Sequence, residues 1–195
     1  MFVEGYQSGL MSVEDYLALE RTSIEIRYEF IDGQVYMLAG GTINHSIISA
    51  NIIRELGTLL RGKPCRVHTS DMKVQVSKKR YLYPDVSVSC DNREQGTAET
   101  LRNPCLIVEV LSRSTEARDR GEKFACYREC PTVQEYVMVN TQQPAVEVFR
   151  RVSGNFWTLH IFGPGDMVDL VSLNVSFPVT AVYENTDLLE ETLDS

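Results

Sequence analysis

The sequence predicts a mixed α/β (α+β) fold in which helices flank a mixed β-sheet. Three observations predict it: apolar residues at helical spacing in a long N-terminal segment, several short apolar or alternating runs typical of strands, and helices interleaved among these strands. The chain has 195 residues, of which 43% are hydrophobic and 24% charged, so it can bury a core. We expect one domain over residues 1–195.

The N-terminal part predicts a helix followed by a β-hairpin. Residues 12–15 (SVED) are typical of a helix start, and this helix should extend to about Arg21. A strand over residues 26–31 then reaches Asp32-Gly33, a dipeptide that favours a two-residue hairpin turn. The return strand is expected over residues 34–38.

The remaining elements are predicted from the same signals, which are helix caps, Gly and Pro breaks, and short apolar runs. In order they are a helix from Asn44 to Leu60, strands over residues 66–69 and 72–76 and from Tyr81 into the strand 85–90 that Asp85 opens, a polar loop over 91–102, a strand from Pro104, a helix from Ser114 or Thr115 to Pro131, strands over 134–140, 145–151 and 157–161, a short strand near Val175, and a weak terminal helix.

The net charge of −8 disfavours a non-specific nucleic-acid binder, which is usually basic. Five of the acids lie in a C-terminal tail, at about residues 184–195, that has no Lys or Arg. Basic residues gather over 78–80 and again from Arg113 to Arg128, so a local positive rim is expected beside the alternative of a solvated charged surface.

The sequence favours a cytoplasmic protein that does not span a membrane. No apolar run approaches the roughly 18 residues of a membrane span, and the N-terminus does not resemble a secretory signal. The five cysteines are odd in number and form no CxxC pair, so we expect reduced thiols rather than disulfides or a zinc site.

Glu109 gives the strongest indication of a functional site. It interrupts the apolar run 106–111 (LIVEVL), and a buried carboxylate costs several kcal/mol unless it is paired, protonated or bound to a metal. A second acid, Asp85, follows Pro84 and opens another apolar run. If the two strands are neighbours, both carboxylates converge on one place.

Two converging carboxylates are typical of a site for a hard divalent cation. Mg²⁺ prefers oxygen ligands at about 2.0–2.1 Å and keeps several waters, so Asp85, Glu109 and the backbone carbonyl of Val110 would suffice. In the following helix, the ammonium of Lys123 would neutralise the carboxylates, orient a water or stabilise the transition state. Helix spacing alone favours the alternative, an Asp119–Lys123 surface pair worth about 0.3–0.5 kcal/mol.

Together these residues resemble the PD-(D/E)xK restriction-endonuclease-like superfamily, and in particular its Uma-type branch. The resemblance runs from about residue 12 to residue 182. It implies a restriction-endonuclease-like core, dependence on a divalent metal and hydrolysis of phosphodiesters. The matching residues are Pro84-Asp85, then Glu109-Val110-Leu111-Ser112, then Asp119, Lys123 and Tyr127.

The chain departs from the simplest form of the superfamily motif at position 111, where Leu stands in place of Lys. The Uma-type branch shares this gap and supplies the Lys from the following helix, as Lys123 would here. Two further residues match that branch: Glu29 as an outer-sphere or second-metal ligand, and His45 as a residue that orients phosphate or water. The alternatives are an exposed strand residue for Glu29 and a polar helix cap for His45.

These expectations describe a DNA endonuclease dependent on Mg²⁺ or Mn²⁺. Asp85 and Glu109 bind the metal, Lys123 assists the attack of water, and Glu29 and His45 contribute. We expect a homodimer, because two sites related by a two-fold axis readily cut two strands, and an unidentified partner could supply specificity. Two other functions remain open: a catalytically inactive binding or dimerisation module, and hydrolysis of a small phosphodiester.

Overall fold

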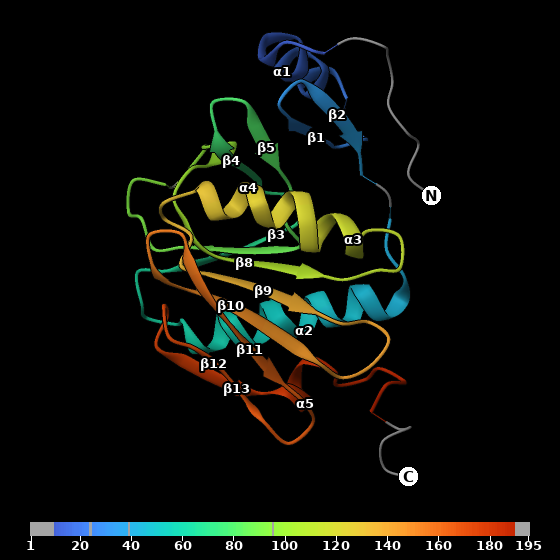
Figure 1. Cartoon of the computed structure of the whole chain (residues 1–195), viewed down its shortest axis with the longest axis vertical. Helices are drawn as coiled ribbons and strands as arrows, with labels where there is room; N and C mark the ends of the chain where they lie inside the picture. The colour runs from blue at the N-terminus through green and yellow to red at the C-terminus, as the bar shows by residue number, and fades with distance from the viewer. Residues whose placement is uncertain (1–9, 24, 39, 95, 190–195) are drawn as a thin grey trace.

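A computed structural model of the chain describes residues 10–189 apart from residues 24, 39 and 95, and shows three β-sheets with helices packed against them (Figure 1). No helix among these residues is long and apolar enough to cross a membrane. The helices are α1 (Val13–Thr22), α2 (Ile43–Leu59), α3 (Glu116–Arg118), the π-helix η1 (Asp119–Lys123), α4 (Phe124–Glu129) and α5 (Val179–Val182).

The strands belong to sheets of six, five and two strands. They are β1 (Tyr28–Ile31), β2 (Gln34–Met37), β3 (Arg66–Thr69), β4 (Lys73–Ser77), β5 (Arg80–Leu82), β6 (Val86–Ser89), β7 (Thr100–Leu101), β8 (Pro104–Val110), β9 (Glu135–Val139), β10 (Val146–Ser153), β11 (Phe156–Phe162), β12 (Met167–Leu170) and β13 (Val175–Pro178).

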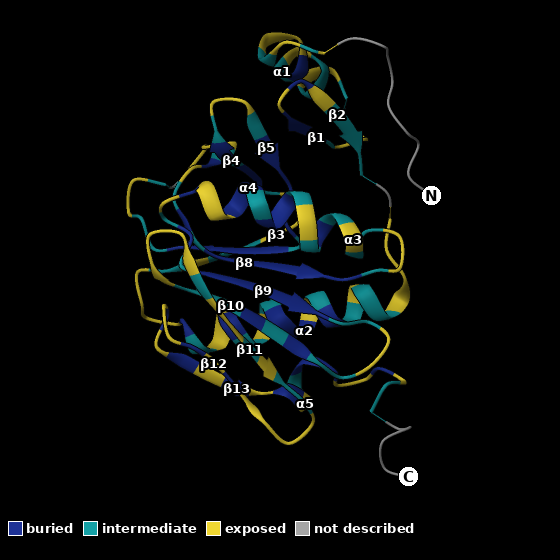
Figure 2. Ribbon diagram, in the orientation of Figure 1, coloured by how far each residue is buried: buried dark blue, intermediate teal, exposed yellow. Residues whose placement is uncertain are grey.

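The six-stranded sheet carries the main core and has the order β11-β10-β9-β8-β6-β3. β8 and β9 are parallel and the other neighbouring pairs are antiparallel, so the sheet is mixed, as the sequence predicts. α2 packs on one face and α4 on the other. Because both faces are covered, β8 and β9 are buried almost throughout, as the dark blue strands of Figure 2 show.

The five-stranded sheet has the order β2-β1-β5-β4-β7 and is covered by α1. Tyr16 of α1 is fully buried, and its ring centroid lies 4.9 Å from that of Phe30 and 5.4 Å from that of Tyr81. The predicted hairpin between β1 and β2 is confirmed. Asp32 and Gly33 have φ angles of 49° and 99°, the left-handed pair that a type I′ turn requires.

Two predictions about the first half of the chain are wrong in detail. Thr42 rather than Asn44 caps α2, because the Thr42 hydroxyl accepts a 3.3 Å hydrogen bond from the His45 N–H. The strand expected to run from Tyr81 into residues 85–90 is two strands in two sheets, β5 and β6. Pro84 lies at the crossing between them, where it has no N–H to give to a sheet ladder.

The C-terminal region differs from expectation in two elements. The sequence analysis does not predict β12, which pairs with β13 and buries Val168 and Leu170. The terminal helix is limited to the four residues of α5 within the described residues. Residues 190–195 of the predicted acidic tail lie outside the described residues.

The prediction of five free thiols is wrong for one pair. Cys65, just before β3, and Cys90, just after β6, form a disulfide. The antiparallel register of β3 and β6 pairs Arg66 with Ser89, which brings the two cysteines together. Sequence spacing alone does not reveal this register. Cys105 is free, and its Sγ lies 3.7 Å from that of Cys90.

Candidate functional site

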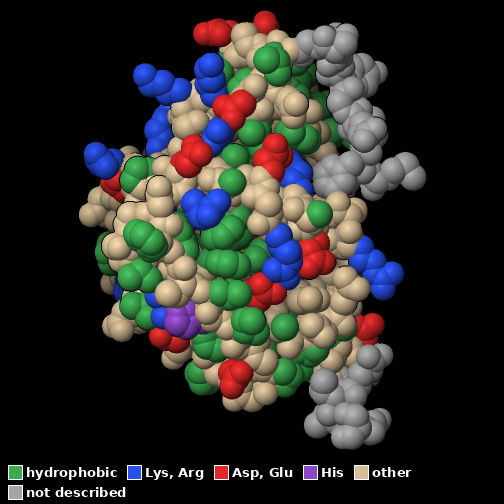
Figure 3. All heavy atoms as spheres, in the orientation of Figure 1, with side chains coloured by type: hydrophobic (Ala, Val, Ile, Leu, Met, Phe, Trp, Pro, Cys, Tyr) green, Lys and Arg blue, Asp and Glu red, His purple; other side chains and the backbone are tan. Residues whose placement is uncertain are grey.

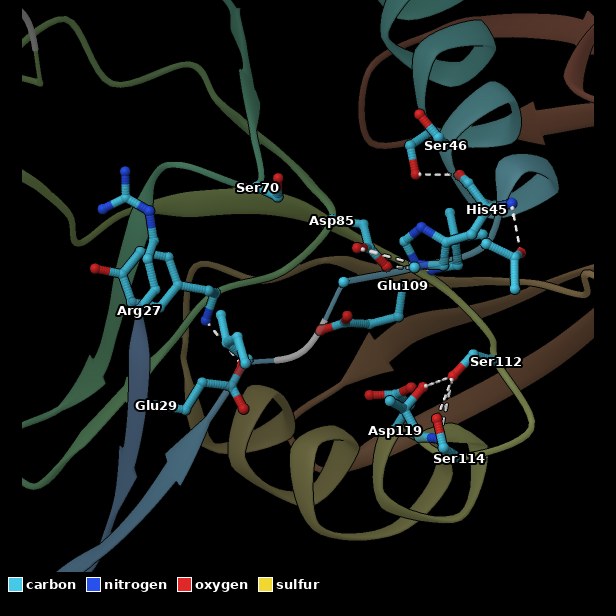
Figure 4. Close-up of a pocket in the computed structure, with 18 of the residues that line it drawn as sticks. Arg27, Glu29, His45, Ser46, Ser70, Asp85, Glu109, Ser112, Ser114 and Asp119 are labelled. Atoms are coloured by element: carbon cyan, nitrogen blue, oxygen red, sulfur yellow. Dashed lines mark hydrogen bonds and ion pairs between the residues drawn. The ribbon is translucent and has the colours of Figure 1, made fainter. Parts of the chain in front are cut away.

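Asp85 and Glu109 meet because β6 and β8 are antiparallel neighbours. The register places Val86 opposite Val108, so the residue before β6 lies beside the end of β8. Asp85 Oδ2 accepts a 2.7 Å hydrogen bond from the N–H of Val110. Both carboxylates line a cavity of about 920 Å³, and Figure 4 shows them directed into the same space. The predicted convergence of the two acids is present.

Glu109 is buried, with 3% of its surface exposed. Its Oε1 lies 2.6 Å from the Nζ of Lys123, so the two side chains form a close buried ion pair. Burial raises the pKa of Glu109 well above its ordinary value; Lys123 opposes this rise, and Asp119 and Asp85 add to it. Lys123 therefore does not fully offset the cost of burying the Glu109 charge, and a further cation beside Glu109 would stabilise its ionised form.

Lys123 lies among three buried acids. Its Nζ is 2.6 Å from Glu109, 3.3 Å from Glu29 and 3.5 Å from Asp119. Burial lowers the pKa of Lys123, but attraction to Glu109, Glu29 and Asp119 outweighs burial and raises the pKa overall. The surface-pair alternative for Asp119 and Lys123 is wrong, because both residues are buried.

The π-helix η1 positions these side chains. It joins α3 to α4, and Asp119, Lys123 and Tyr127 are all buried beneath the helical segment. The hydroxyl of Tyr136, on β9, donates a 2.9 Å hydrogen bond to the Asp119 carbonyl and ties the π-helix to the sheet. π-helical turns are rare and frequently occur at functional sites.

Glu29 is completely buried, so the alternative of an exposed strand residue is wrong. One oxygen accepts a 2.9 Å hydrogen bond from the Tyr83 N–H, and the other accepts one from the guanidinium of Arg118. Burial would raise the pKa of Glu29, but Lys123 and Arg118 hold it below its ordinary value. Since both oxygens have donors or cations beside them, this geometry favours positioning of Lys123 over coordination of a metal.

Arg118 is a site residue that the sequence analysis includes only in a basic cluster. It pairs with Glu29 and Glu122, and its guanidinium carbon lies 3.9 Å from the centre of the Tyr36 ring. Its Nη2 is buried without a hydrogen-bond partner among the described residues. The sequence carries no signal for this role, because Glu29 is 89 positions away along the chain.

His45 extends from the first turn of α2 toward Asp85, with 3.4 Å between Nε2 and Oδ1 (Figure 4). Burial lowers the pKa of His45, but its contacts with Asp85 and the Val110 carbonyl raise it overall. The same contact places the carbonyl of Val110, the predicted third ligand, on the His45 side of the cavity. A Cβ at Gly41 would lie 2.8 Å from this imidazole, so the position requires glycine while the ring stays there.

The residues at the cavity fit a hard divalent cation. No three His, Cys, Asp or Glu side chains of the described ranges are grouped to hold a metal, so a full ligand set needs the Val110 carbonyl and water. Glu109 Oε1, which lies beside the Lys123 ammonium, is a hard oxygen donor. Acids outnumber Arg and Lys in the cavity lining, six to three, so a divalent ion would reduce an excess of negative charge; the acids are Glu25, Glu29, Asp71, Asp85, Glu109 and Asp119, and the cations are Arg27, Arg118 and Lys123.

Comparison with known proteins places this geometry in a family. The model of the Uma2 family, described as "Putative restriction endonuclease", matches residues 13–180. Two uncharacterized proteins of Synechocystis sp. are similar. One, slr1290, is 37% identical over 174 residues, 89% of this chain and 91% of the relative. The other, sll1609, is 31% identical over 153 residues, 77% of this chain and 86% of the relative.

A solved structure supports the fold assignment. The crystal structure of "a putative nuclease belonging to DUF820" from Anabaena variabilis matches with a TM-score of 0.74 at 15% identity, over 89% of this chain and 97% of that one. This likeness confirms the predicted mixed α/β, restriction-endonuclease-like fold. The family match covers most of the sequence and confirms the predicted resemblance. The chain belongs to the Uma2 family, described as putative restriction endonucleases.

Proposed function

We propose that this chain is an endonuclease that hydrolyses phosphodiester bonds of DNA and depends on Mg²⁺ or Mn²⁺. One observation carries the proposal: Asp85 and Glu109, from neighbouring strands, line one cavity in which the Lys123 ammonium lies 2.6 Å from the buried Glu109 carboxylate. Membership of the Uma2 family supports a nuclease at this coarser level.

Asp85, Glu109 and the carbonyl of Val110 are the groups that would hold the metal. When bound, the ion supplies a Lewis acid that polarises the phosphodiester and lowers the pKa of water. The 2.7 Å hydrogen bond from the Val110 N–H fixes Asp85 Oδ2, which leaves Oδ1 directed toward His45 and the cavity. The protein thus orients one carboxylate in advance, which reduces the entropy lost on binding.

Lys123 supplies positive charge beside the acids. Three carboxylates hold its proton, so it acts as an ammonium that stabilises negative charge developing on the phosphoryl group, rather than as a base. Glu29, fixed by Arg118 and the Tyr83 N–H, positions this ammonium. His45 orients the phosphate or the attacking water from the Asp85 side of the cavity.

The missing Lys at position 111 does not favour the inactive binding module. Leu111 is buried in the core between β8 and α4, where it packs in one cluster with Ile107 and Tyr127. The ammonium of Lys123 already contacts Glu109, so the charge that a Lys at 111 would bring is supplied from the helix. This supports a catalytic rather than a purely structural role.

A plasmid-nicking assay tests the proposal. Wild-type protein should convert supercoiled DNA to nicked circles with Mg²⁺ or Mn²⁺ and not with EDTA. Asp85→Asn and Glu109→Gln should each reduce the rate by more than about 100-fold, because both are placed as direct ligands. Asp71→Asn is the matched control, since Asp71 lines the same cavity but is exposed and pairs with Arg27. Metal-independent cutting, or undiminished cutting by both ligand variants, would contradict the proposal.

The association state and the specificity partner stay predictions. A homodimer would allow two cavities to act on two strands. Sedimentation equilibrium at micromolar concentration measures whether the mass corresponds to one chain or to two.

A further inference from the structure

A second cavity adjoins the proposed catalytic one. It has a volume of about 730 Å³, and it shares Thr42, Ser112 and Ser114 with the cavity that contains Asp85 and Glu109. Thr42 precedes α2, and the two serines belong to the loop that follows β8. The two cavities therefore form one continuous opening between the start of α2 and the β8–α3 loop.

The size of this opening favours an extended substrate. Pockets for small molecules usually measure about 300–1,000 Å³. The catalytic cavity alone is near the top of that range, and the two together exceed it. A dinucleotide-sized ligand would leave the second cavity empty, whereas a polynucleotide strand would pass through both.

The Lys and Arg side chains around the opening differ in whether they already form an ion pair with a carboxylate. Arg27 pairs with Asp71, and Arg118 and Lys123 pair with the buried acids. Arg113, in the second cavity, has no carboxylate within ion-pair distance among the described residues. Its Nε donates only a 3.3 Å hydrogen bond to the amide oxygen of Gln142, which leaves most of the guanidinium donors free.

The rest of the protein surface offers no uniformly basic platform on the face drawn in Figure 3, where Lys and Arg side chains are interspersed with Asp and Glu. Arg120, for example, pairs with Glu116 and Glu147. The second cavity contains one acid, Asp187, whose carboxylate accepts a 2.6 Å hydrogen bond from the Asn44 amide. Among the Lys and Arg residues that line the two cavities, Arg113 is therefore the one without an ion-pair partner in the part of the chain that the structure describes.

We infer that the second cavity is a subsite for the substrate strand beside the cleaved bond, and that Arg113 is a positioning residue that binds a neighbouring phosphate. The inference rests on the proposed hydrolysis of DNA and adds the residue that positions the strand beside the cleaved bond. Arg113 is four positions after Glu109, so their Cα atoms are at most about 14 Å apart. With a rise of about 3.4 Å per nucleotide, Arg113 would reach a phosphate within a few nucleotides of the cleaved one.

Fluorescence anisotropy with a labelled 20-nucleotide single-stranded DNA tests the inference. Binding is measured in EDTA, so that no strand is cut, between 50 and 200 mM KCl. Arg113→Gln should weaken binding about tenfold at the lowest salt. It should also reduce the slope of log affinity against log salt by about 0.7, the value for one phosphate contact on a single strand. Arg113→Lys should retain the wild-type slope, because the slope counts charge.

Arg61→Gln is the matched control. Arg61 is also exposed, and it follows the C-terminal end of α2, about 25 Å along the helix from the end that borders the cavity. This variant should bind as the wild type does. Equal salt slopes for wild type and Arg113→Gln, or no binding of the strand by wild type, would overturn the subsite. Metal-dependent nicking and its loss in Glu109→Gln are measured separately and decide the proposed function.

Discussion

Replacing Lys123 with methionine tests whether its ammonium neutralises the buried acids. Methionine keeps an unbranched side chain but removes the charge that lies 2.6 Å from Glu109 and 3.3 Å from Glu29. Glu109, Glu29 and Asp119 would then lie together in a site shielded from water. We expect a large loss of stability in metal-free buffer.

The magnitude follows from the distances. At an effective dielectric constant of about 20, each of the three attractions amounts to about 5–6 kcal/mol. Most of this is offset by the cost of removing the ammonium from water, so loss of one partner of a buried ion pair costs about 3–5 kcal/mol net. For a protein of this length each kcal/mol lowers the melting temperature by about 2–4 °C, so the melting temperature should fall by about 6–20 °C.

The loss should depend on pH, because the acids can escape repulsion by taking up protons. Glu109 has a raised pKa in the folded protein, and removal of Lys123 raises it further. A carboxyl group whose pKa is raised in the folded state contributes its full stability below the pKa of the unfolded state, which is about 4.3 for Glu. That stability is lost as the pH rises through the pKa of the folded state. The deficit of Lys123→Met relative to wild type should therefore be smaller at pH 5 than at pH 8.

Urea unfolding followed by circular dichroism, in EDTA, measures the effect at both pH values. Lys73→Met is the matched control, since Lys73 is also nearly buried but pairs with a single acid, Glu20, at 3.2 Å. Without Lys73, Glu20 keeps hydrogen bonds from the Tyr83 hydroxyl and from the Tyr28 N–H. Lys73→Met should therefore lose less than half as much unfolding free energy as Lys123→Met. A deficit for Lys123→Met below about 1 kcal/mol at pH 8, or one that grows toward pH 5, would refute the reasoning.

Three further predictions concern the metal, Glu29 and the disulfide. Mg²⁺ or Mn²⁺ at 100 times its dissociation constant should raise the unfolding free energy of the wild type by about 2.7 kcal/mol. The control Asp71→Asn should gain the same amount, and Asp85→Asn should gain none. Equal thermal shifts in all three proteins would exclude Asp85 as a ligand. Glu29→Gln should slow nicking about 10- to 100-fold while calorimetric Mg²⁺ affinity changes little, because Glu29 positions Lys123; lost affinity would instead make Glu29 a ligand. Reducing Cys65–Cys90, 25 positions apart, should cost about 3.5 kcal/mol by loop closure, and unfolding unaffected by dithiothreitol would mean that no bond forms in solution.

The strand acids were predictable from the sequence, and the reason is physical. A carboxylate in the middle of an apolar run has few structural explanations, so Glu109 indicates a site without further information. Asp85 could be placed beside it because Pro84 marks the start of a new strand, although the sequence does not show that β5 and β6 lie in different sheets. The mixed sheet and its flanking helices follow from periodicity and element order.

The roles of Glu29 and Arg118, which lie around these acids, were not predictable from local sequence patterns. Glu29 alternates like a surface strand residue, and its burial depends on the packing of the β1–β2 hairpin against the segment that carries Arg118. The direction of Arg118 depends in turn on the π-helix, for which local propensity gives no signal. Contacts across 89 positions are set by tertiary packing, and no pattern within either segment encodes them.

The position of Lys123 explains how this chain can dispense with a Lys at 111. Residues 107, 109 and 111 alternate toward the same side of β8, which is the side that α4 covers. The covering segment therefore passes directly over Glu109, and a Lys on its inner side reaches the carboxylate at 2.6 Å. Position 111 is then free to carry Leu, which joins the core with Ile107. The net charge at the cavity is the same whether β8 or the helix supplies the ammonium, so the proposed binding of a divalent ion does not depend on which element carries the lysine.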